Sequence, residues 1–109
     1  MKMDSDVLIV KDCLTGNNEA FGMLVEKYEK ELFNTALRIV GDYEDAADAT
    51  QSAFVKAYAN LAGYKSDHRF FSWIYRTLVN ESINIVNKRK RLTTTIPNSS
   101  TGMRNGRTP

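Results

Sequence analysis

The segment GDYEDAADATQSAFVKAYANLAG, residues 41–63, indicates the fold class. Its small apolar residues recur at three- and four-residue spacing, which is the period of one helix face. Such a face lets a neighbouring helix approach closely, and its members are Ala46, Ala49, Ala53, Ala57 and Leu61. Gly41 and Gly63 mark the points where helices are expected to stop. The segment therefore predicts a buried helix in a helical protein, starting near Asp42 and ending at Gly63.

The start of this helix carries three aspartates at three-residue spacing, Asp42, Asp45 and Asp48. Asp42 and Asp45 resemble a capping box in which an acid replaces the usual Glu or Gln. Negative charge in this first part of a helix is also favoured by the helix dipole. A metal-dependent enzyme built on the three carboxylates is the alternative. Capping and the dipole explain the first two aspartates without an ion, so we favour the structural interpretation.

Two helices are expected before this segment. The first covers about residues 4–15 and stops at Gly16, with Val7, Val10 and Leu14 on one face. The second starts after Asn17 or Asn18, either of which can cap it, and ends at Gly41. Its apolar stripe keeps a three-or-four spacing and consists of Phe21, Leu24, Val25, Tyr28, Leu32, Ala36 and Ile39.

A fourth helix is expected from about Arg69 to Lys90. Its buried side consists of Phe70, Ile74, Leu78 and Ile85, and its polar side of Arg69, Ser72, Arg76, Asn80, Asn84, Asn87 and Arg91. From Leu92 the sequence turns to Thr, Ser, Asn, Gly and Pro, a composition that cannot bury enough apolar surface to become ordered. The sequence thus predicts an all-α fold, with a compact four-helix domain over residues 1–91 and a disordered tail or linker over residues 92–109.

The composition argues against several classes of protein. A chain of 109 residues supports one small domain. The longest apolar run, residues 7–10, is far shorter than the ~20 residues that span a membrane, and the acidic N-terminus does not fit a secretory signal. We therefore expect a cytoplasmic protein without a membrane partner.

Cys13 and His68 are the single cysteine and histidine, so we expect no internal disulfide and no zinc site. Motifs for phosphate loops or nucleophile elbows are absent too, so we expect neither enzyme activity nor a cofactor.

The charge is distributed unevenly along the chain. Residues 1–67 carry seven Lys/Arg against twelve Asp/Glu, a net charge of −5, whereas residues 68–109 carry eight Lys/Arg against one acid, a net charge of +7. An acidic half beside a basic half suggests two different partners, one of them nucleic acid.

The expected fourth helix has the residue types that single-stranded nucleic acid requires. Arginines and asparagines on one side can contact phosphates and base edges, while Trp73 and Tyr75 can stack on exposed bases. Tyr64 precedes the helix and the basic run 88–91 ends it. Two simpler interpretations stay open: Trp73 belongs to the core, or the basic run only complements the helix dipole.

Three motifs in order resemble the extracytoplasmic-function sigma factors. Residues 45–58, DAADATQSAFVKAY, resemble region 2.2 of that family, and residues 70–76, FFSWIYR, resemble its regions 2.3 and 2.4. Upstream, residues 16–21, GNNEAF, with Leu24, Val25 and Tyr28, resemble the family's opening segment. Together these motifs span nearly the whole expected domain. The resemblance implies the compact four-helix bundle of sigma region 2, in agreement with the helical periodicity.

The resemblance also implies a first partner, core RNA polymerase. In the family, the second and third helices dock on the clamp helices of the polymerase β′ subunit. The positions of this chain that match are Asp48, Gln51, Phe54 and Lys56, with Asp45 at the rim or acting as a cap. An alternative role for Phe54 is the hydrophobic core.

The second implied partner is promoter DNA, through the non-template strand of the −10 element. The loop before the fourth helix would hold a flipped base, with Tyr64 stacking or forming pocket walls. The residues expected to read base edges are Ser66, Asp67, His68 and Asn80, and those expected to contact phosphates are Arg69, Arg76, Lys88 and Arg91. Trp73 would support or wedge the junction between paired and open DNA. Lys65 and Ser72 complete the expected surface. Asp67 has helix capping as its alternative role.

The resemblance further suggests an anti-sigma partner, which this family commonly has. The family's second helical domain, which binds the −35 element, has no counterpart in these residues, so low promoter affinity is expected. Two alternatives therefore stay open beside the sigma interpretation. One is a nonspecific helical DNA-binding protein, and the other is a truncated sigma relative without promoter activity.

Overall fold

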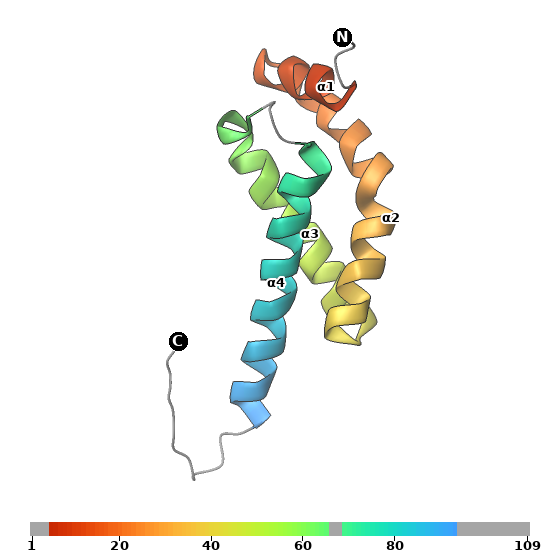
Figure 1. Ribbon diagram of the computed structural model, residues 1–109, viewed down its shortest axis with the longest axis vertical. Coiled ribbons are helices and arrows are strands. Elements are labelled where there is room, and N and C mark those ends of the chain that lie inside the picture. Colours follow the sequence, from red (N-terminus) through yellow and green to blue (C-terminus); the bar gives the residue numbers. More distant parts are fainter. Residues whose placement is uncertain (1–4, 66–68, 94–109) are drawn as a thin grey trace.

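The computed structural model describes residues 5–65 and 69–93, and all regular elements in those ranges are helical. The elements are α1 (Ser5–Leu14), the 3-10 turn η1 (Asn18–Ala20), α2 (Phe21–Val40), α3 (Tyr43–Ala59), the 3-10 turn η2 (Leu61–Gly63) and α4 (Phe70–Thr93). Helices α2, α3 and α4 each pack against the other two, and α1 lies across one end of them (Figure 1). This arrangement confirms the predicted all-α fold with four helices. None of the helices in these described ranges has the length and apolar content needed to cross a bilayer.

The small-residue face of α3 is buried as predicted. Ala46, Ala49 and Ala53 are completely buried, and Ala57 nearly so. The predicted end of this helix at Gly63 is wrong, because α3 ends at Ala59 and Leu61 belongs to η2. Asn60 donates its side-chain amide to the Lys56 carbonyl at 2.8 Å, and the following residues tighten into a 3-10 turn. That turn still places Leu61 in the core.

The junction between α2 and α3 follows the predicted stop and start signals. Gly41 adopts a φ of 73°, a left-handed conformation that a glycine takes without steric cost, and its N–H donates to the Leu37 carbonyl at 2.8 Å. Asp42 then accepts a hydrogen bond from the Asp45 N–H at 2.9 Å through its carboxylate. The predicted N-cap is confirmed, and it reverses the chain direction between the two helices within two residues.

The predicted cap of α2 is wrong. The Asn17 side chain donates to the Asp12 carboxylate at 3.0 Å, and neither Asn17 nor Ala20, the residues preceding η1 and α2, caps with its side chain. Helix α2 instead continues directly from η1, where the Phe21 N–H donates to the Asn18 carbonyl. Because a helical turn already precedes α2, its first N–H groups have backbone acceptors and need fewer side-chain partners.

The apolar face of α1 differs from the prediction at one position. Val7 and Val10 are buried, but Leu14 is 52% exposed, and Cys13 occupies the buried position instead. Asp6 lies on the same side and is 2% exposed. Its carboxylate accepts a hydrogen bond from Lys27 Nζ at 2.8 Å and another from the Tyr28 hydroxyl. A buried carboxylate with partners on α2 therefore helps to attach α1 to the bundle.

Helix α4 extends further than predicted. It begins at Phe70 and continues through Thr93, so the first two residues of the expected tail are helical. The rest of that expected tail lies outside the described residues, and the division into 1–91 and 92–109 stays a prediction. Phe70, Ile74 and Leu78 are completely buried as predicted, while Ile85 is only partly buried. The buried side also includes Ser82, whose hydroxyl donates to the Leu78 carbonyl at 2.9 Å.

Replacing the buried carboxylate is expected to loosen α1. Asp6→Asn removes the ion pair with Lys27 and leaves an amide donor where a carboxylate accepted two hydrogen bonds. We expect the free energy of unfolding, measured by urea titration at pH 7, to fall by about 1–3 kcal/mol. The matched control Asp12→Asn, at an exposed position of the same helix, is expected to change it by less than about 0.5 kcal/mol. Equal effects of the two substitutions would contradict a stabilising role for the buried group.

The same cluster predicts a loss of stability at alkaline pH. Burial and the hydrogen bond to Asp6 raise the pKa of Tyr28, and the hydrogen bond to Asp6 raises the pKa of Lys27. The folded protein therefore keeps these protons to a higher pH than the unfolded chain does. This contribution is present below about pH 10, the ordinary value of both groups, and is lost as the pH rises through the folded-state pKa values.

We expect unfolding free energies measured from pH 8 to 11.5 to decline above about pH 10 in the wild type. Tyr28→Phe removes one of the two titrating groups and should make the decline shallower. Tyr43→Phe, at an exposed tyrosine, should follow the wild-type curve. A wild-type decline no steeper than that of Tyr28→Phe would rule out the contribution of the Tyr28 hydroxyl.

Candidate functional site

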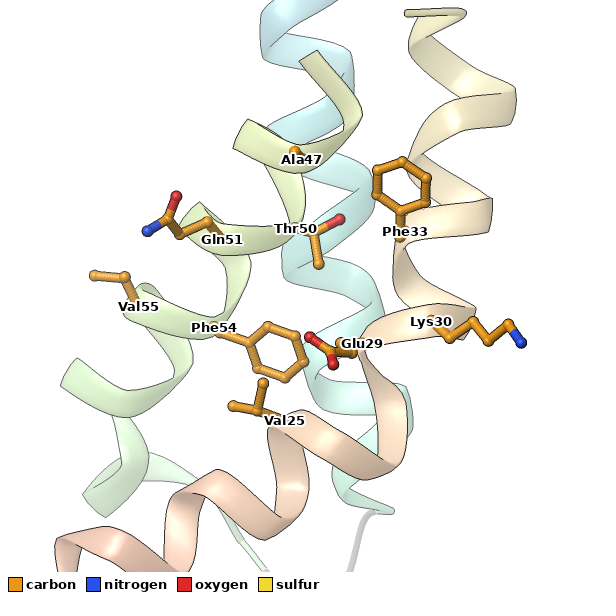
Figure 2. A pocket seen from close by; sticks show the side chains of 9 residues that line it. All are labelled: Val25, Glu29, Lys30, Phe33, Ala47, Thr50, Gln51, Phe54 and Val55. Carbon is orange, nitrogen blue, oxygen red and sulfur yellow. The ribbon is translucent and has the colours of Figure 1, made fainter. Parts of the chain in front are cut away.

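A groove lies between α2 and α3, with a volume of about 540 Å³ (Figure 2). It is lined by Val25, Glu29, Lys30, Phe33, Ala47, Thr50, Gln51, Phe54 and Val55. Figure 2 shows the Phe54 ring extending from α3 toward Val25 and Glu29 of α2. Phe54 is 7% exposed and packs edge-on against Phe21, with 6.3 Å between ring centroids. Phe54 is thus a core residue whose remaining surface forms part of the groove.

A second groove, of about 490 Å³, lies between α3 and α4. Its lining is more polar and consists of Asp48, Gln51, Ser52, Val55, Lys56, Glu81, Asn84, Ile85 and Lys88. Gln51 and Val55 line both grooves, so they form a ridge on α3, which we call the α3 ridge. Both side chains of the ridge are exposed, and Val55 is an apolar residue at 60% exposure.

The predicted polymerase contacts are divided between the two grooves and one position outside them. Gln51 and Phe54 line the α2–α3 groove, and Asp48, Gln51 and Lys56 line the α3–α4 groove. Asp45 lies in neither. Its backbone N–H donates to Asp42, and its carboxylate lies 3.4 Å from Arg89 Nε. Asp42 is thus the cap, and the Asp45 side chain forms an ion pair with α4 in place of the capping role that was its alternative.

Ion pairs between described residues join α3 to α4. Lys56 Nζ lies 2.6 Å from a carboxylate oxygen of Glu81, and Arg89 pairs with Asp45 while also donating to the Val40 carbonyl at 2.5 Å. Helical period and charge along the chain do not reveal Glu81 and Arg89 as partners of α3. One signal was available, since Glu81 is the only acid among residues 68–109.

The outward side of α4 carries a third groove, of about 420 Å³, which we call the α4 outer groove. It is lined by Phe71, Ser72, Tyr75, Arg76, Val79 and Asn80. Three predicted DNA contacts, Ser72, Arg76 and Asn80, are therefore brought together. Tyr75, whose ring was expected to stack on exposed bases, lines the same groove, and its ring centroid lies 5.5 Å from that of Phe71, which was not predicted as a contact. Their spacing of four residues, which places two aromatic side chains on one helix face, was the available signal.

Tyr64, predicted to stack on a base or to form pocket walls, is buried. Tyr64 is 9% exposed, and its ring centroid lies 5.7 Å from that of Phe70 and 5.3 Å from that of Trp73. Because these rings already cover it, little of its surface is open to a base. Trp73 is partly buried against the same cluster, which supports its alternative role in the core.

Among the other predicted DNA contacts, those that the structure describes lie at different places. Ser66, Asp67 and His68 lie outside the described residues. Lys65 and Arg69, on either side of them, are exposed, as is Arg91 near the end of α4. Lys88 lines the α3–α4 groove together with Asp48 and Lys56, and not the α4 outer groove.

The three aspartates at the start of α3 do not converge on one point. Asp42 accepts the Asp45 N–H, Asp45 faces Arg89, and Asp48 lines the α3–α4 groove. Within residues 5–65 and 69–93, no group of three or more His, Cys, Asp or Glu side chains is arranged to hold a metal ion. The geometry of these residues gives no support to the metal-dependent alternative.

The chain resembles a known family of protein domains. Residues 24–92 match the model of the family described as sigma-70 region 2. The chain is 33% identical over 91 residues to the RNA polymerase sigma-H factor of Pseudomonas aeruginosa, covering 84% of this chain and 47% of that protein. Other relatives, named as extracytoplasmic-function sigma factors, match at 30 and 34% identity. The chain spans about half the length of the curated relatives it matches, from 41 to 47%.

Solved structures show the same fold. An engineered region 2 of sigmaE in complex with GTAAAA superposes with a TM-score of 0.74 at 30% identity, covering 84% of this chain and 95% of that one. CnrH in complex with the cytosolic domain of CnrY superposes with a TM-score of 0.69 at 25% identity, covering 91% of this chain and 69% of that one.

Proposed function

This chain belongs to the sigma-70 region 2 family, with extracytoplasmic-function sigma factors among its relatives, and we propose that it binds core RNA polymerase through α3 and opens the promoter −10 element with α4. The observation that carries the proposal is the separation of two chemically different surfaces. The α3 ridge lies between two grooves, while the α4 outer groove combines aromatic, amide and guanidinium groups.

The shape of the α3 surface suits a coiled coil. A ridge with a groove on each side is complementary to two adjacent helices, since helices pack by fitting ridges into grooves. The α2–α3 groove offers apolar contacts from Phe33 and Phe54, and the α3–α4 groove offers charged groups. An apolar centre with a polar rim is the usual composition of a specific protein interface. These features support docking on the β′ clamp helices, with Gln51 and Val55 at the centre of the contact.

The α4 outer groove suits an unstacked base on a single strand. Arg76 can contact a phosphate, and Asn80 can form hydrogen bonds with a base edge. Phe71 and Tyr75 add aromatic surface on which a base can stack, and Tyr75 is 38% exposed. Extruding a base costs a few kcal/mol, which stacking and edge contacts must offset. The solved sigmaE region 2 in complex with GTAAAA supports this assignment.

A protein regulator is a further part of the proposal. CnrH has been solved with the cytosolic domain of CnrY, and this supports an anti-sigma partner for the present chain. As a subunit of a transcribing polymerase, the protein would act in the cytoplasm without a catalytic role or a cofactor of its own.

The polymerase surface is tested at the α3 ridge. Gln51→Ala and Val55→Asp change exposed side chains there, so they should weaken binding to a β′ clamp-helix fragment about tenfold each, measured by isothermal titration calorimetry. Leu8→Asp, at an exposed apolar position on α1, is the matched control and should bind as the wild type does. Phe54→Ala is unsuitable, because removing a buried aromatic ring costs about 3–5 kcal/mol of stability. Wild-type affinity of both ridge variants would refute this interface.

The DNA surface is tested with a hexamer selected from a randomised single-stranded pool. We expect Asn80→Ala to reduce the preference for that hexamer over its shuffled sequence about 5- to 100-fold, because the base-edge contact is lost. Arg76→Ala should weaken binding to both sequences equally. It should also reduce the slope of log affinity against log salt concentration by about one, because one phosphate contact is lost. Fluorescence anisotropy measures both.

Asn84→Ala is the matched control, since Asn84 lines the α3–α4 groove and not the outer one. It should keep the wild-type preference. If the pool yields no enriched sequence and the wild type binds all strands alike, the chain is a nonspecific DNA-binding protein.

A further inference from the structure

We propose that Lys56 is a positioning residue for DNA binding: by pairing with Glu81 it neutralises the acid on the DNA-binding helix. The inference rests on the proposed function, because it assumes that α4 binds DNA. It changes the role of Lys56, which family resemblance assigns to polymerase contact alone.

The geometry of the pair supports this role. Lys56 lies on α3 and Glu81 on α4, 25 positions later, and their charged atoms are 2.6 Å apart. The Glu81 side chain is only 16% exposed, whereas that of Lys56 is 57% exposed. Solvent therefore screens the carboxylate poorly, and the ammonium group of Lys56 is its direct counter-charge.

The position of Glu81 in α4 explains why its charge matters. It follows Asn80, which lines the α4 outer groove, and successive residues of a helix are about 100° apart around its axis. The carboxylate is thus within one helix diameter, about 10 Å, of the proposed DNA surface, which is comparable to the Debye length at physiological salt. A phosphate backbone at that surface would be repelled by an uncompensated carboxylate. Glu81 is also the only acid among residues 68–109, so no second acid of that segment masks the effect of its charge.

A double-mutant cycle on single-stranded DNA affinity tests the pairing. Lys56→Ala should weaken binding of the selected hexamer about three- to tenfold at low salt, because Glu81 loses its counter-charge. Glu81→Gln in the Lys56→Ala background should restore the affinity to within about twofold of the wild type. Lys56→Arg keeps the charge and should bind normally.

The control variant Lys30→Ala distinguishes the loss of the Lys56–Glu81 ion pair from a general change in the net charge of the protein. Lys30 is an exposed lysine on α2 that lines the other groove of α3. Lys30→Ala lowers the net charge as Lys56→Ala does, but it removes no partner of Glu81. The gain in affinity from Glu81→Gln should therefore be at least about threefold larger in the Lys56→Ala background than in the wild-type and Lys30→Ala backgrounds. An equal gain in all three backgrounds would overturn the inference.

The clamp-helix fragment provides a second measurement on the same variants. If Lys56→Ala lowers polymerase affinity and leaves DNA affinity unchanged, Lys56 is a polymerase contact only and the inference is wrong. If the wild type selects no hexamer and does not bind the fragment, the proposed function itself fails. The two failures are thus distinguishable.

Discussion

The close packing of α3 against α2 and α4 is the constraint on which the other features of the molecule depend. Ala46, Ala49 and Ala53 bury only a methyl group each, and all three are completely buried. A larger side chain at any of them would have to push a neighbouring helix outward, since protein interiors have little free volume. Because the alanine face of α3 packs closely against α2 and α4, the opposite face of α3 is exposed and forms the ridge between the two grooves. The close packing also brings Lys56 within reach of Glu81 on α4.

Helix α1 is attached in a different way. Val7, Val10 and Cys13 supply a small apolar contact, and the buried Asp6 adds an ion pair and a hydrogen bond to α2. A buried carboxylate is costly unless it is paired and hydrogen-bonded, so its position is strict. The cluster therefore specifies where α1 lies on α2, whereas the alanine face of α3 sets how closely the helices pack.

Helix α4 contributes residues to the core, to the α4 outer groove and to the α3–α4 groove. Its buried side fills the core, its outer groove presents Arg76 and Asn80, and its later turns line the groove shared with α3. Residues four apart in a helix are displaced by about 40° around the axis, so a polar stripe gradually turns from one face toward the next. This turning explains why Lys88 lies beside Asp48 and Lys56 although it continues the basic end of the same helix. Helix α4 thus contributes both to the α3–α4 groove and to the α4 outer groove.

The sequence by itself determined the helices and most of their ends. Helical period, the glycine at 41 and the Asp42 cap are properties of neighbouring residues, and the structure agrees with them. Three ordered motifs resemble those of the sigma family, and the family match over residues 24–92 agrees with them. The missed details at the helix ends, such as the Asn17 cap and the end of α3, arose where a 3-10 turn offered backbone partners that side-chain preferences do not reveal.

Only the tertiary structure decided which residues of different helices meet. The family resemblance assigns binding roles to Tyr64 and Lys56, and packing buries Tyr64 among aromatic rings and pairs Lys56 with Glu81. It likewise joins Phe71 and Tyr75 to Arg76 and Asn80 in one groove. Local patterns specify which face of a helix is buried. They do not specify how helices separated by tens of residues are placed against one another, because that depends on how all their side chains fit together at once.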